Sequence, residues 1–191
     1  MVQPIEAFAR TQAAVEPLVS AVGVGQMGDS TPCAEWDVRR LLNHLVGVNL
    51  EFGAIAAGEA PPAPGTDHLG SDPAGAFRAS GAVAGAAFGK PGMLERTYAF
   101  PWGEEPGTGL VQHVADELLI HGWDLARATG QPPIFDDDLV ETSLANWRRW
   151  FAEEPGPRHE SMGTERPAPP GASAVDRLAA YLGRDVGPGA G

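Results

Sequence analysis

Apolar residues recur every three or four positions along much of this chain, which is the period of an amphipathic helix. The pattern is clear over residues 4–23, where Gly23 and Gly25 supply a stop. A second stripe begins after Asp37, which suits an N-cap, and runs to about Ala57. The predicted core positions are Ile5, Phe8, Ala9, Ala13, Val15, Leu18, Val19 and Val22 in the first helix and Val38, Leu41, Leu42, Leu45, Val48 and Phe52 in the second.

Further segments have helical character, and residues 109–129 carry the strongest pattern among them. Gly130 is placed to end that helix, and Pro132 lies beyond it. The stretch 94–100 is short and β-prone, which predicts an extended segment crossing the end of a bundle. The other predicted helices span residues 74–88, 136–151 and 172–182, and loops rich in Gly or Pro cover 58–73 and 154–171.

These elements predict an all-α fold, a bundle of four main helices with one or two extra C-terminal helices. The chain has 191 residues, of which 43% are hydrophobic, enough for one domain with a core. We expect a single domain over residues 1–191. Within it, residues 1–153 form the helical bundle and residues 154–191 form a loop plus a short C-terminal helix.

Composition narrows the classes of partner. The formal net charge of -12 argues against nucleic acid, since phosphate binding needs clustered basic side chains, and against an anionic membrane surface. Cys33 is the only cysteine, which excludes an intramolecular disulfide and fits a reducing cytosol. The N-terminus lacks a signal-peptide pattern, and no apolar run approaches the roughly 20 residues of a membrane span. We therefore expect a cytoplasmic protein whose partners are neither nucleic acid nor a membrane.

Glu117 and His121 are the clearest candidate functional residues. A spacing of four on a helix places them on one face, about 5–6 Å apart at Cβ. A carboxylate and an imidazole there can share one divalent metal ion, such as zinc, and three protein ligands leave a place for water or substrate. His44, in the apolar stretch 41–46, is the best candidate for the third ligand. By spacing alone, however, such a Glu–His pair is more often solvated than bound to metal.

Two longer segments carry a family resemblance. Residues 31–47 read Thr-Pro-Cys-Ala-Glu-Trp-Asp-Val-Arg-Arg-Leu-Leu-Asn-His-Leu-Val-Gly, and residues 117–131 include His-Gly-Trp-Asp-Leu-Ala. In these segments the chain resembles the DinB-like superfamily and, within it, metal-binding proteins related to mycothiol-dependent maleylpyruvate isomerase. The resemblance implies a divalent metal, usually zinc, at His44, Glu117 and His121. It also implies a low-molecular-weight thiol such as mycothiol as cosubstrate, an isomerase or thiol S-transferase reaction, and a homodimer as one option.

Three functions stay open beside one another. The first is the metal- and thiol-dependent enzyme, although the isomerase has a further C-terminal α/β domain and only about 40 residues follow residue 151 here. The second is a non-catalytic module that binds a metal or a small molecule without turnover. The third is a metal-dependent hydrolase, which would need a general base near the metal, with His113 and Asp124 as the candidates.

The remaining candidates each have two interpretations. His113 could be a fourth ligand or a pocket acid/base, but a partly solvated histidine near the helix start is the commoner case. Asp124 could orient the imidazole of a ligand histidine or pair with Arg127 on the surface. Trp36 is expected in the core or a pocket wall, and Cys33 in a structural role.

Overall fold

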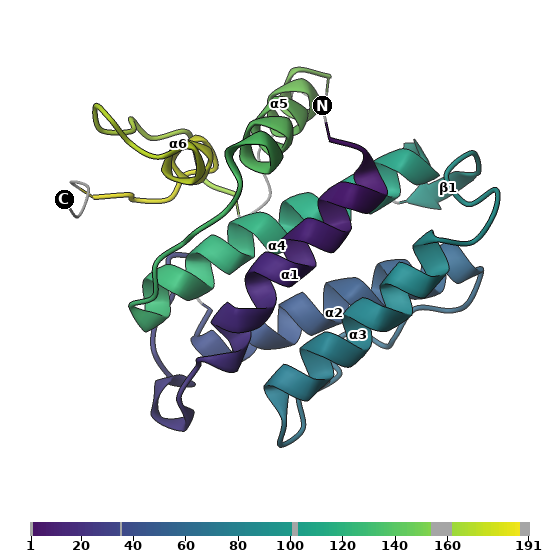
Figure 1. Ribbon diagram of the computed structural model, residues 1–191, viewed down its shortest axis with the longest axis horizontal. Coiled ribbons are helices and arrows are strands. Elements are labelled where there is room, and N and C mark those ends of the chain that lie inside the picture. Colours follow the sequence, from purple (N-terminus) through teal and green to yellow (C-terminus); the bar gives the residue numbers. More distant parts are fainter. Residues whose placement is uncertain (1, 35, 101–102, 154–161, 188–191) are drawn as a thin grey trace.

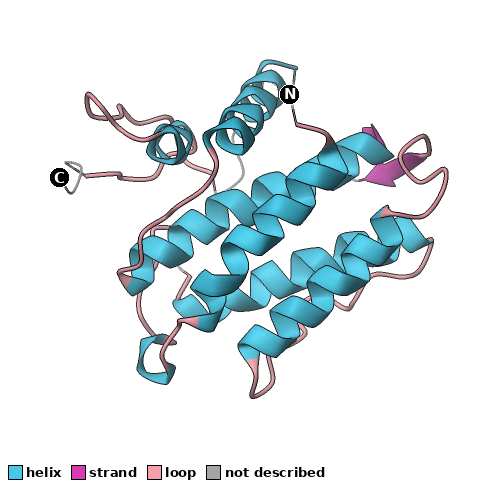
Figure 2. Ribbon diagram, viewed as in Figure 1, coloured by secondary structure: helices cyan, strands magenta, loops and turns pink. Residues whose placement is uncertain are grey.

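The computed structural model describes residues 2–34, 36–100, 103–153 and 162–187. Within these ranges the chain forms six α-helices, a 3₁₀ turn and one short hairpin, and helices dominate the fold (Figure 2). Helices α1 (Pro4–Ser20), α2 (Val38–Ala57), α3 (Pro73–Phe88) and α4 (Gly107–Thr129) pack as a four-helix bundle (Figure 1). The predicted all-α, DinB-like bundle is therefore confirmed.

Two further helices extend the bundle on the side of α4. Helices α5 (Asp137–Glu153) and α6 (Ala174–Tyr181) contact each other and α4, and in Figure 1 they lie away from α2 and α3. These are the extra C-terminal helices that the sequence predicted. Residues 154–161 of the predicted loop before α6 lie outside the described ranges.

The helix ends follow from local chemistry. Asp37 caps α2 as predicted, since its side chain accepts a hydrogen bond from the Arg40 backbone amide at 2.7 Å. Gly58 and Gly130 end α2 and α4 with φ values of 79° and 71°, a left-handed conformation that glycine adopts without steric cost.

The predicted extended segment is half of a hairpin. Strand β1 (Thr97–Phe100) pairs in antiparallel fashion with β2 (Gly103–Pro106), and α4 begins directly afterwards. The second strand was not predicted, because its sequence Gly-Glu-Glu-Pro has no alternation of apolar and polar positions. The hairpin lies at one end of the bundle, as Figure 1 shows.

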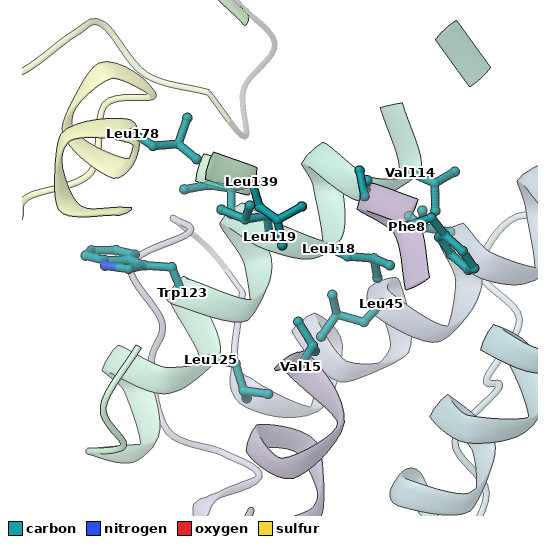
Figure 3. Packing of buried hydrophobic residues seen from close by; sticks show 14 of the residues in the cluster. Phe8, Val15, Leu45, Val114, Leu118, Leu119, Trp123, Leu125, Leu139 and Leu178 are labelled. Carbon is teal, nitrogen blue, oxygen red and sulfur yellow. The ribbon is translucent and has the colours of Figure 1, made fainter. Parts of the chain in front are cut away.

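Helix α4 lies at the centre of the molecule and is buried at every position from Val114 to Ala126. Figure 3 shows that its side chains contribute to the hydrophobic core on two sides of the helix. Leu118 points towards Val15 of α1 and Leu45 of α2, whereas Leu119 lies beside residues of α5 and α6. The candidate site residues of α4, Glu117 and His121, are therefore held from both sides. Among the described residues, no helix has the length and apolarity to cross a bilayer.

Candidate metal centre

The structure brings the three predicted donors to one point between α2 and α4. The Nε2 atom of His44 lies 3.1 Å from Oε2 of Glu117, and Nε2 of His121 lies 3.4 Å from the same oxygen. The two imidazole rings have centroids 4.7 Å apart. Two ring nitrogens and a carboxylate oxygen thus converge from distant parts of the sequence, which is the donor set that the spacing and the resemblance predicted.

The site is deeply set but open on one side. His121 is 0% exposed and Glu117 is 8% exposed, whereas the His44 side chain keeps 28% of its surface in contact with solvent. The Nε2 atom of His121 is buried and has no hydrogen-bond partner among the described residues. A buried polar atom without a partner is costly. A divalent ion would satisfy this nitrogen and the Glu117 carboxylate together, so the donor set fits a metal.

A buried chain of polar contacts fixes the orientation of His121. Its Nδ1 atom lies 3.0 Å from Oδ2 of Asp124, and Asp124 in turn accepts hydrogen bonds from Arg184 Nη2 at 2.9 Å and Nε at 3.2 Å. A proton on Nδ1 leaves the lone pair of Nε2 directed towards Glu117 and His44, which is how carboxylates orient ligand histidines. Of the two interpretations of Asp124, the structure shows the orienting one. Arg127 instead places its guanidinium 5.5 Å from the ring centroid of Trp123.

Arg184 was not among the candidate residues. It lies beyond α6, it is 3% exposed, and it is separated from Asp124 by 60 positions. Because an arginine after a short terminal helix is ordinarily exposed, the local pattern carried no sign of its burial.

The surroundings of the cluster shift the pKa values of His44, Glu117 and His121 in different directions. Burial by itself opposes the charged forms, and it lowers the pKa of His44. Burial also acts to raise the pKa of Glu117, but its polar contacts with the His121 and His44 rings hold it well below its usual value. For His121, burial is outweighed by the hydrogen bond with Asp124 and the close approach of the Glu117 carboxylate, which raise its pKa to about 9. Protons and a metal ion would therefore compete for the His121 ring.

A tryptophan covers the donors. The indole ring of Trp36 stacks on His121 at a centroid distance of 5.4 Å and lies 4.7 Å from the ring of His44. Trp36 is thus a wall of the site, as predicted. The guanidinium of Arg40 lies over the Trp36 ring at 5.3 Å from its centroid. This cation–π contact helps to hold the indole in place.

Cys33 belongs to a second group of potential ligands, with His121 and Asp124. Chemistry favours the His44 group over this one. Burial raises the pKa of the Cys33 thiol to about 11, so the loss of its proton that metal binding requires would cost more than for an exposed thiol. Asp124 is already engaged by Arg184. A structural role for Cys33 fits its burial.

His113 lies one turn before Glu117 on α4 but belongs to neither group of potential ligands within the described residues. Its ring centroid lies 5.1 Å from that of Phe52 and 6.3 Å from that of Trp147. Asp116, another residue that the sequence analysis missed, is buried nearby, and burial raises its pKa to about 7. Its signal was its place on a helix that is apolar on most of its circumference.

Comparisons with known proteins agree with this fold. The model of the family described as the mycothiol maleylpyruvate isomerase N-terminal domain matches residues 8–126. Two uncharacterized proteins from two strains of Mycobacterium tuberculosis are each 36% identical over 183 residues, which is 96% of this chain and 98% of theirs. The crystal structure of the mycothiol-dependent maleylpyruvate isomerase superposes with a TM-score of 0.61 at 15% identity, over 78% of this chain and 70% of that one. A histidine-to-alanine variant of that enzyme gives the same TM-score at 13% identity.

Proposed function

Because this chain belongs to the mycothiol maleylpyruvate isomerase N-terminal domain family, we propose that it binds a divalent metal ion and acts on a small molecule with a thiol cosubstrate. His44, Glu117 and His121 would hold the ion, with zinc as the expected metal. The reaction class that follows is a thiol S-transfer or a thiol-assisted isomerisation. A low-molecular-weight thiol of the mycothiol type is the cosubstrate that the family relationship supports.

One observation supports the metal assignment above all, the convergence of two imidazole nitrogens on one carboxylate oxygen, with the buried Nε2 of His121 making no hydrogen bond to the described residues. A divalent ion at this point would supply Lewis-acid chemistry, which polarises a substrate oxygen or favours the ionised form of a thiol. Asp124 and Arg184 hold the His121 ring in position, and the ring of Trp36 shields the donors from water. The partly exposed side chain of His44 marks the side from which a ligand would approach.

The state of the chain's own thiol supports a role for a thiol from solution. Cys33 is the only cysteine, it is 2% exposed, and its thiol stays protonated near neutral pH because burial raises its pKa to about 11. A buried neutral thiol is a poor nucleophile. Any thiol chemistry at this centre would therefore depend on a small-molecule thiol.

A hydrolase is less well supported. Both oxygens of Asp124 accept hydrogen bonds from Arg184, and Oδ2 also faces His121, so this carboxylate is occupied as an orienting group. Asp124 is therefore not arranged to receive a proton from a water at the His44 cluster, which leaves His113 as the candidate base. His113 packs against Phe52 and Trp147.

Elemental analysis of the purified protein tests the assignment. We expect about one divalent ion per chain in the wild type and its loss in His121→Ala, which removes one of the three proposed donors. His68→Ala is the matched control, since His68 lies in the loop after α2 and is not one of the potential ligands. Unchanged metal content in His121→Ala would refute the ligand set. A thiol-transfer screen with and without a chelator then separates the enzyme from a non-catalytic metal protein.

A further inference from the structure

A cavity of about 130 Å³ lies between the first half of α4, helix α5 and the β1–β2 hairpin. The three proposed metal ligands do not line it, so it is distinct from the metal centre although α4 serves both. Cavities of roughly 150 Å³ in protein cores take up benzene. The volume therefore suits one compact group, about the size of a six-membered ring.

Aromatic side chains form most of the apolar wall of this cavity. They are Phe52 from α2, Phe100 from β1, and Trp147 and Trp150 from α5. The rings of Phe52 and Phe100 are stacked, with centroids 5.7 Å apart and planes 28° apart. The faces of such rings carry partial negative charge and attract cations.

Two carboxylates line the same cavity. Asp116 is 5% exposed, and its oxygens accept hydrogen bonds from the side-chain amides of Gln112 at 2.9 Å and Asn146 at 3.4 Å. Both of these donors are uncharged, so neither of them compensates the charge of this buried acidic group. Glu105 of β2, half-buried, supplies the second carboxylate.

The one arginine of the lining does not take up the Asp116 carboxylate. Arg149 is exposed, and its Nη2 atom donates to Oδ1 of Asn146 at 3.2 Å. Its charge is therefore screened by solvent. The hydrogen bond from Arg149 orients the Asn146 amide, whose nitrogen faces Asp116.

We propose that this cavity binds the ammonium end of a small organic cation, a primary amine attached to a compact apolar ring. The ammonium would donate to Asp116, and the ring would lie between the aromatic side chains. This proposal does not depend on whether a metal is bound at the His44 cluster, nor on the reaction catalysed there.

Benzylamine and benzyl alcohol are matched probes, since they share a ring and differ in charge. The binding of both probes is measured at one pH by NMR titration of nitrogen-15-labelled protein. The indole N–H signals of Trp147 and Trp150 report on the cavity. We expect saturable binding of benzylamine that shifts these two signals, and binding of benzyl alcohol at least roughly tenfold weaker, because a charge-assisted hydrogen bond is lost. Equal binding of the two probes, or no saturable binding of benzylamine, would overturn the proposal.

Variants test the site itself. Asp116→Asn should weaken benzylamine roughly tenfold or more, while Asp185→Asn, an exposed acidic control, should leave it unchanged. If Asp116→Asn does not fold, Glu105→Gln and Trp150→Leu decide, and each should weaken benzylamine about two- to fivefold. Benzylamine affinity that is unchanged in whichever of these variants fold would place the probe elsewhere and contradict the assignment.

Discussion

At the scale of single residues, the carboxylate of Asp124 lies between a guanidinium and an imidazole and is completely buried. Its contact with His121 fixes the ring that the metal would use, and its contact with Arg184 compensates its charge. The geometry therefore makes Arg184 a positioning residue that acts on the metal centre through Asp124.

Replacing Arg184 by Ala should be strongly destabilising, by about 3–5 kcal/mol, because it leaves the Asp124 carboxylate buried without its cation. Metal affinity should fall as well, by roughly 10- to 100-fold, as for other partners of ligand histidines. Urea unfolding and a chelator competition measure the two effects. Arg166→Ala is the matched control, since its pair with Asp185 is exposed and worth at most about 1 kcal/mol. Equal losses in the two variants would show that burial of the Arg184 pair is unimportant.

The proton on His121 gives the metal-free protein a characteristic pH dependence. Its pKa is raised from 6.5 to about 9 in the folded state. The resulting stabilisation is complete below the unfolded pKa and is lost as the pH rises through 9, since the folded state then holds the extra proton. The metal-loaded protein should show the reverse trend over this range, because removal of the proton favours metal binding. Thermal unfolding of both forms at several pH values measures this. Stability that changes with pH in the same direction in both forms would contradict the prediction.

The convergence of His44, Glu117 and His121 could be predicted from sequence, because two of them share a helical face and the third lies in an apolar stretch of a recognisable motif. The burial of Asp116 had a signal in its apolar surroundings on α4, but the contacts made by Arg184 and Asp116 could not be predicted. The role of Arg184 depends on a contact across 60 positions, and that of Asp116 on which side of α4 meets α5. Periodicity describes a helix face but does not say which element covers it.

At the scale of elements, periodicity predicted the buried positions of α2 better than those of α1, because it does not show which part of a helix its neighbours cover. Every predicted core position of α2 is buried, whereas Ile5, Ala9 and Ala13 of α1 are exposed. These three residues border a groove between α1 and α3. The spacing identified both helices correctly, but α1 has apolar residues over a wider arc than its neighbours cover.

Gly122, in the His-Gly-Trp-Asp motif, marks the close approach of α1 to α4. A Cβ atom there would lie 2.7 Å from Cγ2 of Val15 and 3.1 Å from Cζ of Phe135. We expect Gly122→Ala to destabilise the protein by about 1–3 kcal/mol through overpacking. Gly47→Ala in α2, where the nearest atom is 3.6 Å away, should be neutral or stabilise by up to about 1 kcal/mol. Denaturant unfolding of both variants distinguishes packing from helix propensity, and a stabilised Gly122→Ala would refute the close approach.

At the scale of the whole molecule, the proposed metal would join α2 to α4, because His44 lies on the first of these helices and Glu117 and His121 on the second. Removing it should lower the stability of the entire domain, by about 2.7 kcal/mol when the free metal had been at 100 times its dissociation constant. Thermal unfolding with and without a chelator measures the loss. His68→Ala should respond to the chelator as the wild type does, and His121→Ala should not respond. A wild type that ignores the chelator would speak against a bound ion.

Helix α4 has no free side between Val114 and Ala126. Such a segment tolerates few substitutions, since each one disturbs the hydrophobic core, the donor cluster or the groups that orient the donors. The hairpin, the outer face of α5 and the stretch after α6 are more permissive. Divergent members of such a lineage would therefore acquire new preferences for their ligands from these peripheral parts, while the central helix stays nearly constant.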